Sequence, residues 1–103
     1  MPAGSYGGPV QFSKDLRDAV ARGDITVSIR LWERPKARAG RRYVSHDIEI
    51  EVDSVELLPF SAVTRDDVVR SGEPDREALR KRAAHAGPIA DDTPIYRIEF
   101  HVV

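Results

Sequence analysis

The sequence contains no cysteine and no long hydrophobic run. Without cysteine the chain cannot form a disulfide framework, a thiolate metal site or a cysteine nucleophile. No segment approaches the roughly 20 consecutive apolar residues that a membrane-spanning helix needs. The opening MPAGSYGGP also lacks the cationic and apolar regions of a signal peptide. These absences predict a cytoplasmic protein with no membrane partner.

The length and composition predict one globular domain. A chain of 103 residues can bury one core but not two, and its 41% hydrophobic and 32% charged residues are ordinary for a folded protein. The glycine-rich residues 1–8 are expected to be a flexible leader, and residues 9–103 the single domain. Arginine greatly outnumbers lysine, which is typical of a GC-rich, bacterial genome.

Positive charge is concentrated in one stretch. Residues 30–42 contain six basic residues and one acid, a local charge of +5, whereas the whole chain carries −1. Trp32 and Tyr43 accompany these cations. A near-neutral protein that gathers cations beside aromatic residues is expected to use that surface for an anion, because guanidinium groups bind phosphate and aromatic rings stack on unpaired bases.

The first half of the chain predicts a strand, a helix and a second strand. Residues 10–12 could form a short strand, and residues 14–21 an amphipathic helix that Ser13 caps and Gly23 ends. Residues 25–31 alternate apolar and polar side chains, as a half-buried strand does. Thr26, Ser28 and Arg30 should then share one face of that strand. Pro35 bars its continuation, so residues 33–40 form a loop.

The second half predicts two strands, two helices and a final strand. Residues 41–45 and 46–58 alternate, with a change of phase that indicates a β-bulge near Asp53 and turns Val55 and Leu57 inward. Thr64 and Asp67 have capping-box spacing before a helix over 65–71. A helix over 76–86 and a strand over 94–103 follow. The expected class is a mixed α+β fold, a small and mainly antiparallel β-barrel flanked by short helices.

The pattern Gly23-x-x-Thr26-x-x-x-Arg30 resembles the G-x-K-T-x-x-x-R signature of the ASCH domain, a member of the PUA-like superfamily. The likeness covers residues 10–103. It includes Gly40, the strand over 48–55, the helix that ends at Gly72 and the final alternating strand. It implies a PUA-like β-barrel with a cleft beside the first helix. The ligand that it implies is RNA or a nucleoside.

One departure from the family pattern bears on catalysis. Small members of the family hydrolyse acetylated cytidine with a lysine, a hydroxyl and an acid. Here Ile25 occupies the lysine position, Ser28 retains the hydroxyl and Glu73 lies near the place of the acid. A hydroxyl without an amine to activate it lacks its base. The sequence therefore favours binding over catalysis, with Ser28 and Glu73 as weak catalytic candidates.

Other patterns lend less support to a site. The row Asp47, Glu49, Glu51 and Asp53 could hold a cation, but it is more typical of a solvated strand edge, where Glu49 or Glu51 could instead pair with Arg30. Ser45, His46 and Asp47 would not form a catalytic relay on a strand, because alternate side chains point to opposite faces. No histidine spacing indicates a metal, and no cofactor is expected. The basic residues of the helix over 76–86 are expected to be solvated.

The predicted function is therefore the binding of single-stranded RNA or a modified nucleotide in a basic cleft. Two alternatives remain open: a nucleoside-directed amidohydrolase or ribonuclease of the same family, and a protein-interaction module whose basic loop meets an acidic partner. The sequence does not indicate the oligomeric state. The candidate ligand contacts are Thr26, Ser28, Arg30, Trp32, Arg34, Lys36, Arg38, Arg41, Arg42 and Tyr43.

Overall fold

The computed structural model of this chain describes residues 10–103, so the predicted leader lies outside the described residues. The described elements follow one another in the order η2 (Lys14–Leu16), α1 (Arg17–Ala21), β1 (Val27–Arg30), β2 (Arg42–Ser45), β3 (Ile48–Pro59), η3 (Phe60–Ala62), α2 (Arg65–Arg70), α3 (Arg76–Ala83), η4 (Ala84–Ala86) and β4 (Pro94–Val102).

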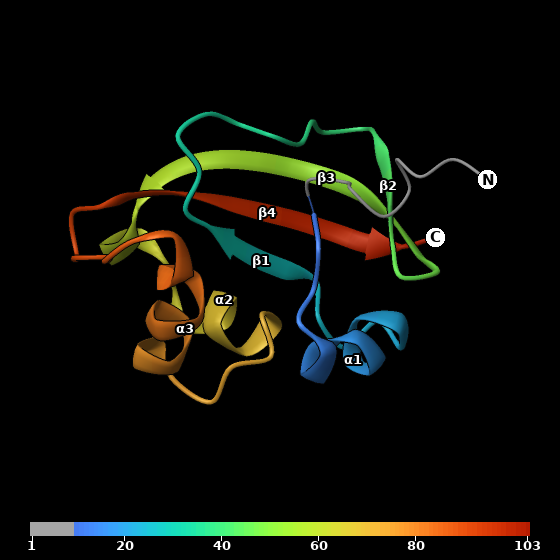
Figure 1. The fold of residues 1–103 in the computed structure, drawn as a ribbon, viewed down its shortest axis with the longest axis horizontal. Helices are drawn as coiled ribbons and strands as arrows, with labels where there is room; N and C mark the ends of the chain where they lie inside the picture. Colours follow the sequence, from blue (N-terminus) through green and yellow to red (C-terminus); the bar gives the residue numbers. More distant parts are fainter. Residues whose placement is uncertain (1–9) are drawn as a thin grey trace.

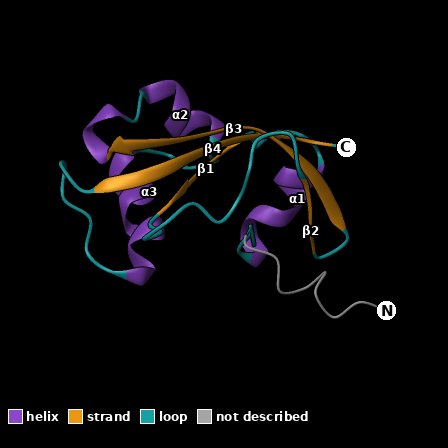
Figure 2. Cartoon of the chain, turned by 90° about the horizontal axis from the view of Figure 1, so that it is seen from above, coloured by secondary structure: helices purple, strands orange, loops and turns teal. Residues whose placement is uncertain are grey.

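The four strands form one curled antiparallel sheet in the order β1-β4-β3-β2. The last strand in the chain, β4, lies between β1 and β3, while β1 and β2 are the two edges (Figure 1). Seen from above, the long β3 crosses the molecule and α1 lies at the opposite end from α2 and α3 (Figure 2). The structure thus confirms the predicted α+β class, with the sheet as an open half-barrel rather than a closed barrel.

Side chains from the two faces of the sheet pack into two separate cores. The barrel core contains Val10, Phe12, Val20, Ile25, Ala37, Ile50, Val52, Tyr96, Ile98 and Phe100. The helix core contains Val27, Ile29, Phe60, Val63, Val68, Leu79, Ala83, Ile89 and Ile95. Strand β4 supplies both, because successive side chains on a strand point to opposite faces.

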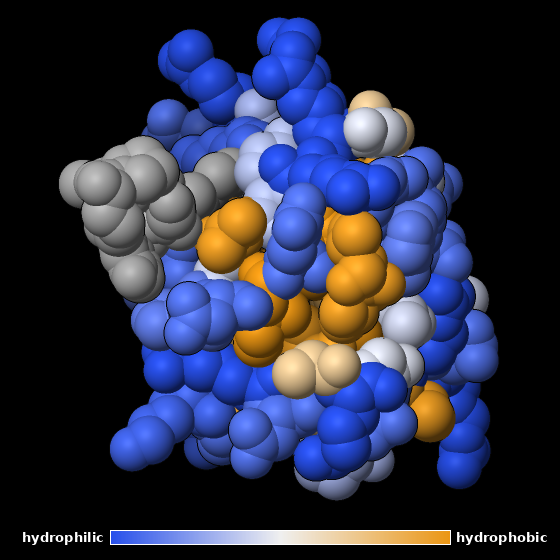
Figure 3. Space-filling view, turned by 90° about the vertical axis from the view of Figure 1, so that its right-hand side faces the viewer, coloured by the Kyte–Doolittle hydropathy of each residue, from blue (hydrophilic) through white to orange (hydrophobic). Residues whose placement is uncertain are grey.

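The open end of the half-barrel leaves apolar side chains partly accessible. Leu16, Ala19, Ile48 and Val102 pack against the barrel core without being fully buried. A space-filling view shows an apolar patch surrounded by hydrophilic side chains on the side of the molecule that carries α1, β2 and the C-terminus (Figure 3). No helix in the described part of the chain is both long enough and apolar enough to cross a bilayer.

The structure corrects two expectations about the strands. Residues 10–12 are not a strand, although Val10 and Phe12 are buried in the barrel core. The alternation of the first strand starts only at Val27, so Ile25 packs in the barrel core while Val27 and Ile29 pack in the helix core. Capture of the Thr26 backbone N–H by the carbonyl of Arg70, away from β4, accounts for this change of phase.

The predicted bulge in β3 is confirmed by a register shift between Val52 and Ser54. Val55 still packs against the barrel core after the bulge, but Leu57 is 59% exposed rather than turned inward. Leu58 instead contacts the helix core. At this end of β3 the helices α2 and α3 bury the opposite face of the sheet, so that face takes the apolar side chain.

The predicted helices α2 and α3 are confirmed, and the first predicted helix is confirmed only in part. Thr64 and Asp67 exchange the two hydrogen bonds of a capping box, and Asp75 accepts a bond from the N–H of Ala78 at the start of α3. Gly23 follows α1 with a positive φ of 83°. Ser13, however, makes no capping bond, and the first turn is a 3-10 helix.

An ion-pair network fixes α2 to the sheet. The buried Asp67 accepts a 2.9 Å hydrogen bond from Arg97 Nε on β4, and Arg70 binds Glu99 on the same strand. Burial acts to raise the pKa of the Asp67 carboxyl. The hydrogen bonds from the Thr64 backbone and from Arg97 outweigh it, so that the pKa lies below its usual value of 3.8.

The substitution Asp67→Asn is expected to lower the free energy of unfolding by about 1–3 kcal/mol at neutral pH, because it removes a helix cap and a buried ion pair. Since folding lowers the pKa of Asp67, its contribution is fully present above 3.8 and is lost as the pH falls through the lower folded-state value. Urea unfolding across acidic pH measures the difference. The control Asp66→Asn, at an exposed neighbour, should cost under about 0.5 kcal/mol, and equal losses would contradict the assignment.

Gly72 ends α2 where the backbone is left-handed and the space is closed. A Cβ there would lie 2.6 Å from Cδ1 of Ile25, whereas Gly40, with almost the same φ, has no atom within 4 Å. Gly40→Ala should therefore cost about 1 kcal/mol of stability through its φ alone. Gly72→Ala should cost roughly 1–3 kcal/mol more through overpacking. Denaturant unfolding measures the loss of stability in both variants. Similar losses would show that the Ile25 side chain moves aside without cost, which would contradict the predicted overpacking.

Candidate functional site

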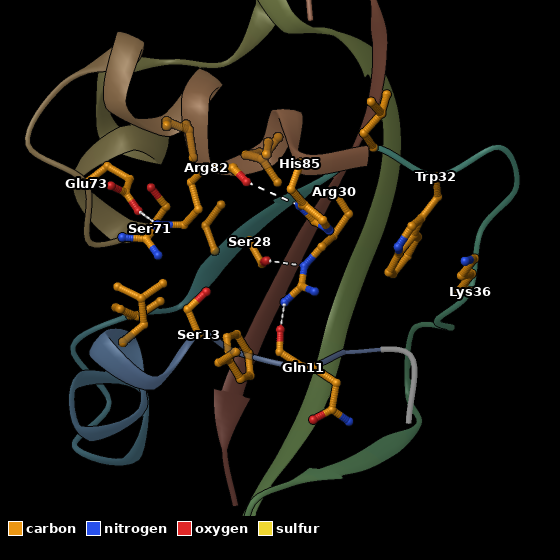
Figure 4. Close-up of a pocket in the computed structure, with 18 residues that line it drawn as sticks. Gln11, Ser13, Ser28, Arg30, Trp32, Lys36, Ser71, Glu73, Arg82 and His85 are labelled. Carbon is orange, nitrogen blue, oxygen red and sulfur yellow. Dashed lines mark hydrogen bonds and ion pairs between the residues drawn. The ribbon is translucent and has the colours of Figure 1, made fainter. Parts of the chain in front are cut away.

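A pocket of about 550 Å³ lies alongside β1, between the N-terminal segment and α3. One wall comes from residues 11–16, the other from α3, and the loop between α2 and α3 closes the inner end. Nine polar or charged residues line it: Gln11, Ser13, Ser28, Arg30, Lys36, Ser71, Glu73, Arg82 and His85. Figure 4 shows these side chains and Trp32 around the cavity.

Arg30 extends from β1 into the centre of this pocket. Its Nε donates a 2.7 Å hydrogen bond to Ser28 Oγ, and its Nη2 donates a 2.6 Å bond to the carbonyl of Gln11 (Figure 4). The guanidinium carbon also lies 5.4 Å from the ring centroid of Phe12. The strand positions both polar side chains, because Ser28 and Arg30 pair with Ile98 and Tyr96 and so share the face of the barrel core.

The guanidinium of Arg30 is largely removed from water and has no negative partner among the described residues. Burial lowers its pKa to about 10, so that it remains a cation at neutral pH. Among residues 10–103 no carboxylate lies within salt-bridge distance of it, and the alternative pairing with Glu49 or Glu51 is wrong: those acids contact Arg42. A desolvated cation that faces a cavity and lacks an acidic neighbour is suited to bind an anion.

The weak catalytic candidates Ser28 and Glu73 line the same pocket, but each is bonded to an arginine. Ser28 Oγ accepts the bond from Arg30, and Glu73, almost fully buried, is bound by Arg82 Nε. Ile25 is buried against Gly72, in the place where the resemblance would require an amine. The pocket therefore offers no lysine base beside the Ser28 hydroxyl.

Arg82 links three segments at the inner end of the pocket. From α3 it binds Glu73, and its two terminal nitrogens donate bonds of 2.8 and 3.2 Å to the carboxylate of Asp15 in η2. The bond to Arg82 lowers the pKa of Asp15, and the bond to Asp15 raises the pKa of Arg82 above its usual value. Both shifts show that each side chain stabilises the charged form of the other, and this charged pair links the two walls.

The opposite end of the pocket carries Trp32 and Lys36 (Figure 4). Trp32 is half-buried, and its ring centroid lies 5.9 Å from that of Tyr96, so part of the indole belongs to the barrel core. The remainder lines the cavity with the exposed Lys36. An aromatic surface and a cation thus stand at the end opposite Arg82 and Glu73.

The other predicted contacts do not line the pocket. Thr26 Oγ1 accepts a 2.9 Å bond from Arg70, Tyr43 accepts one from the backbone N–H of Arg38, and Arg42 pairs with Glu49 and Glu51. The side chains of Arg34, Arg38 and Arg41 are exposed on the loop between β1 and β2, with no acidic partner among the described residues. The structure therefore unites Ser28, Arg30, Trp32 and Lys36, and leaves the others outside the cavity.

Sequence reasoning missed five pocket residues: Gln11, Ser13, Ser71, Arg82 and His85. They come from three segments, residues 11–13, 71 and 82–85, which lie far apart in the chain and which no local spacing connects. The expectation that the basic residues of α3 are solvated is wrong for three of them. Arg76 binds the backbone carbonyls of Phe60 and Val63, Arg80 stacks on Phe60, and Arg82 makes the bridge described above.

Two other clusters do not form a second site. His46 and Asp47 are the turn between β2 and β3, not part of a strand as expected, and Ser45 Oγ lies 3.3 Å from His46 Nδ1. Ser45 is nevertheless fully buried, so its hydroxyl is not open to a substrate. Glu51, Asp53 and His101 lie close together, and all three already have partners: His101 Nδ1 lies 2.9 Å from an Asp53 carboxylate oxygen, and Glu51 pairs with Arg42.

The substitution Arg82→Gln is expected to lower the free energy of unfolding by about 1–2 kcal/mol, because it leaves the buried Glu73 without a cation; partial solvation of Arg82 keeps the loss below that of a fully buried pair. Adding Glu73→Gln should recover part of this loss. Arg22→Gln, which breaks an exposed pair with Asp24, serves as the control and should cost little. Equal losses for Arg82 and Arg22 in denaturant unfolding would contradict the bridging role.

Comparison with models of known protein families finds no match to this sequence. No curated protein is significantly similar to it either. Any relationship therefore has to be judged from the fold.

Two solved structures share that fold. An ASCH domain from Lactobacillus crispatus superposes with a TM-score of 0.64 at 22% sequence identity, over 82% of this chain and 68% of that domain. A protein of the DUF984 family from Enterococcus faecalis superposes with a TM-score of 0.68 at 17% identity, over 86% of this chain and 67% of that protein. The resemblance stated from the sequence is thereby confirmed at the level of the fold: this chain is an ASCH-like α+β half-barrel.

Proposed function

We propose that this protein binds single-stranded RNA or a nucleotide, with a phosphate held by Arg30 and a base inside the pocket. The observation that carries the proposal is the desolvated guanidinium of Arg30, which faces the cavity without a carboxylate partner among the described residues. Such a group gains more from a bound anion than a fully solvated cation does, because it has already lost much of its water. The ASCH-like fold supports a nucleic-acid-binding role.

The dimensions and lining of the pocket fit one nucleotide. A volume of about 550 Å³ lies within the usual range for small-molecule sites. Guanidinium nitrogens that are not bonded to Ser28 or Gln11 remain available to a phosphate oxygen. The indole of Trp32 at the opposite end offers a flat apolar surface to a base. Charge and stacking are therefore available within one cavity.

Exposed cations beyond the pocket favour a polynucleotide over a free nucleotide. The loop between β1 and β2 begins at the Trp32 and Lys36 end of the cavity and carries Arg34, Arg38 and Arg41. Their charges are not neutralised by acids among the described residues, unlike that of Arg42. A strand whose base occupies the pocket could place its neighbouring phosphates along this loop.

The alternative of a hydrolase draws on one observation, the presence of Ser28 and Glu73 in the same pocket. The group bonded to the Ser28 hydroxyl is Arg30, a protonated side chain that cannot act as its base, and the carboxylate of Glu73 is bound by Arg82. The same contacts support a binding site, in which Ser28 orients Arg30. We therefore assign binding, and not hydrolysis, to this pocket.

Titration of a labelled single-stranded RNA at several salt concentrations tests the proposal. Five cations are expected to contact phosphates: Arg30 and the exposed loop residues Arg34, Lys36, Arg38 and Arg41. The slope of log affinity against log salt concentration should then be about −3.5, at roughly 0.7 per contact. Arg30→Gln should weaken binding about tenfold or more, and Arg30→Lys should weaken it less, because lysine keeps the charge but loses the planar donor pair.

Arg42→Gln is the matched control, since Arg42 is already paired with two acids, and it should change the affinity little. Circular dichroism of each variant separates lost binding from lost folding. An affinity that is absent at low salt, or that falls equally in the Arg30 and Arg42 variants, would overturn the proposed function.

A further inference from the structure

The free edge of β1, on the side away from β4, carries backbone groups that have no partner in the sheet. Strand β1 pairs only with β4, and the register joins Val27 to Glu99 and Ile29 to Arg97. The N–H of Phe100 donates to the carbonyl of Thr26, which sets the hydrogen-bonded pairs of this ladder at even-numbered residues of β1. The N–H and C=O of Ser28 and Arg30 therefore face β4, and those of Val27 and Ile29 face away.

These outward groups face the cavity rather than another strand. Ile29 is only 5% exposed and Val27 only 1%, and both line the pocket. Among the described residues no side chain or backbone group bonds to the N–H or C=O of Ile29. A backbone donor and acceptor at a free strand edge can form hydrogen bonds with a ligand without breaking any bond of the sheet. The N–H and C=O of Ile29 are therefore available to a ligand inside the cavity.

The shape of the pocket selects the kind of ligand. An extended peptide that added a strand to β1 would need to run along the whole edge. Glu73 and Arg82 close the inner end (Figure 4). Arg82 also binds Asp15 there, and β1 spans only four residues. A flat base can enter from the end that carries Trp32 and reach Ile29 without passing this bridge.

We propose that the backbone N–H and C=O of Ile29 bind the Watson–Crick edge of one unpaired base. An extended residue presents its N–H and C=O side by side and in the same direction. Each of the four RNA bases carries a neighbouring acceptor and donor on that edge, so one residue can form two hydrogen bonds with one base. The inference rests on the proposed function and adds to it that the base must be unpaired.

The position of Arg30 agrees with this arrangement. It is the next residue after Ile29, about 3.3 Å further along the strand, and its guanidinium lies in the same cavity. A nucleotide with its base against the Ile29 edge therefore has a cation nearby for its phosphate.

The test uses the full chain labelled with nitrogen-15 and the four ribonucleoside 5′-monophosphates as probes. Each probe is compared with the same nucleotide methylated so that its Watson–Crick edge loses the donor. The nucleotide that binds should lose affinity about tenfold or more on methylation, because the backbone groups of Ile29 are then left unpaired. Hydrogen exchange at the Ile29 amide should slow when the unmodified nucleotide binds, while the amides of Ser28 and Arg30, already bonded to β4, serve as internal controls.

The outcomes separate this inference from the proposed function. If nucleotides bind through Arg30 but methylation and the Ile29 amide make no difference, the base-edge inference is wrong and the proposed function stands. If neither nucleotides nor single-stranded RNA bind, both the base-edge inference and the proposed function are wrong. If the Ile29 amide is protected without nucleotide, and more so as the protein concentration rises, a second copy or another strand occupies the edge and the inference is overturned.

Discussion

The arrangement of the site depends on one feature of the sheet: β1 has a single neighbouring strand, β4. This pairing orients Ser28 and Arg30 toward the barrel core and Val27 and Ile29 toward the helix core, so that one short strand anchors both apolar clusters. Because β1 has no second neighbour, its free edge becomes one side of a pocket between the N-terminal segment and α3. A closed barrel would have paired this edge and removed the pocket.

The arginines of the pocket decide between binding and catalysis. Arg30 occupies the hydroxyl of Ser28, and Arg82 occupies the carboxylate of Glu73 while it ties α3 to η2. Ile25 fills apolar space against Gly72, where a charged amine would have to be buried at considerable cost. One cation is therefore used to hold the walls together and the other is left to face the cavity. That division is suited to a site that retains an anion.

Local patterns predicted what depends on neighbouring residues. The capping box at Thr64 was predictable because it joins residues three positions apart. The bulge after Val52 and the alternation from Val27 were predictable because the order of apolar and polar side chains records which face is buried. Only part of the pocket could be predicted from the sequence. Arg30 and Trp32 lie in a conspicuous basic stretch, whereas the role of Arg82 depends on Glu73 and Asp15, which are 9 and 67 positions away. Thr26 was misplaced because a backbone bond from its N–H to Arg70 shifts the phase of the strand, which no periodicity reveals.

The central claim is that Arg30 serves as the anion-binding cation of the pocket beside β1. A crystal structure of the protein with a short single-stranded RNA tests it most directly. The account predicts a phosphate oxygen within hydrogen-bond distance of the Arg30 guanidinium and a base lying between Trp32 and the edge of β1. RNA bound to another surface, with Arg30 still bonded only to Ser28 and the carbonyl of Gln11, would contradict it.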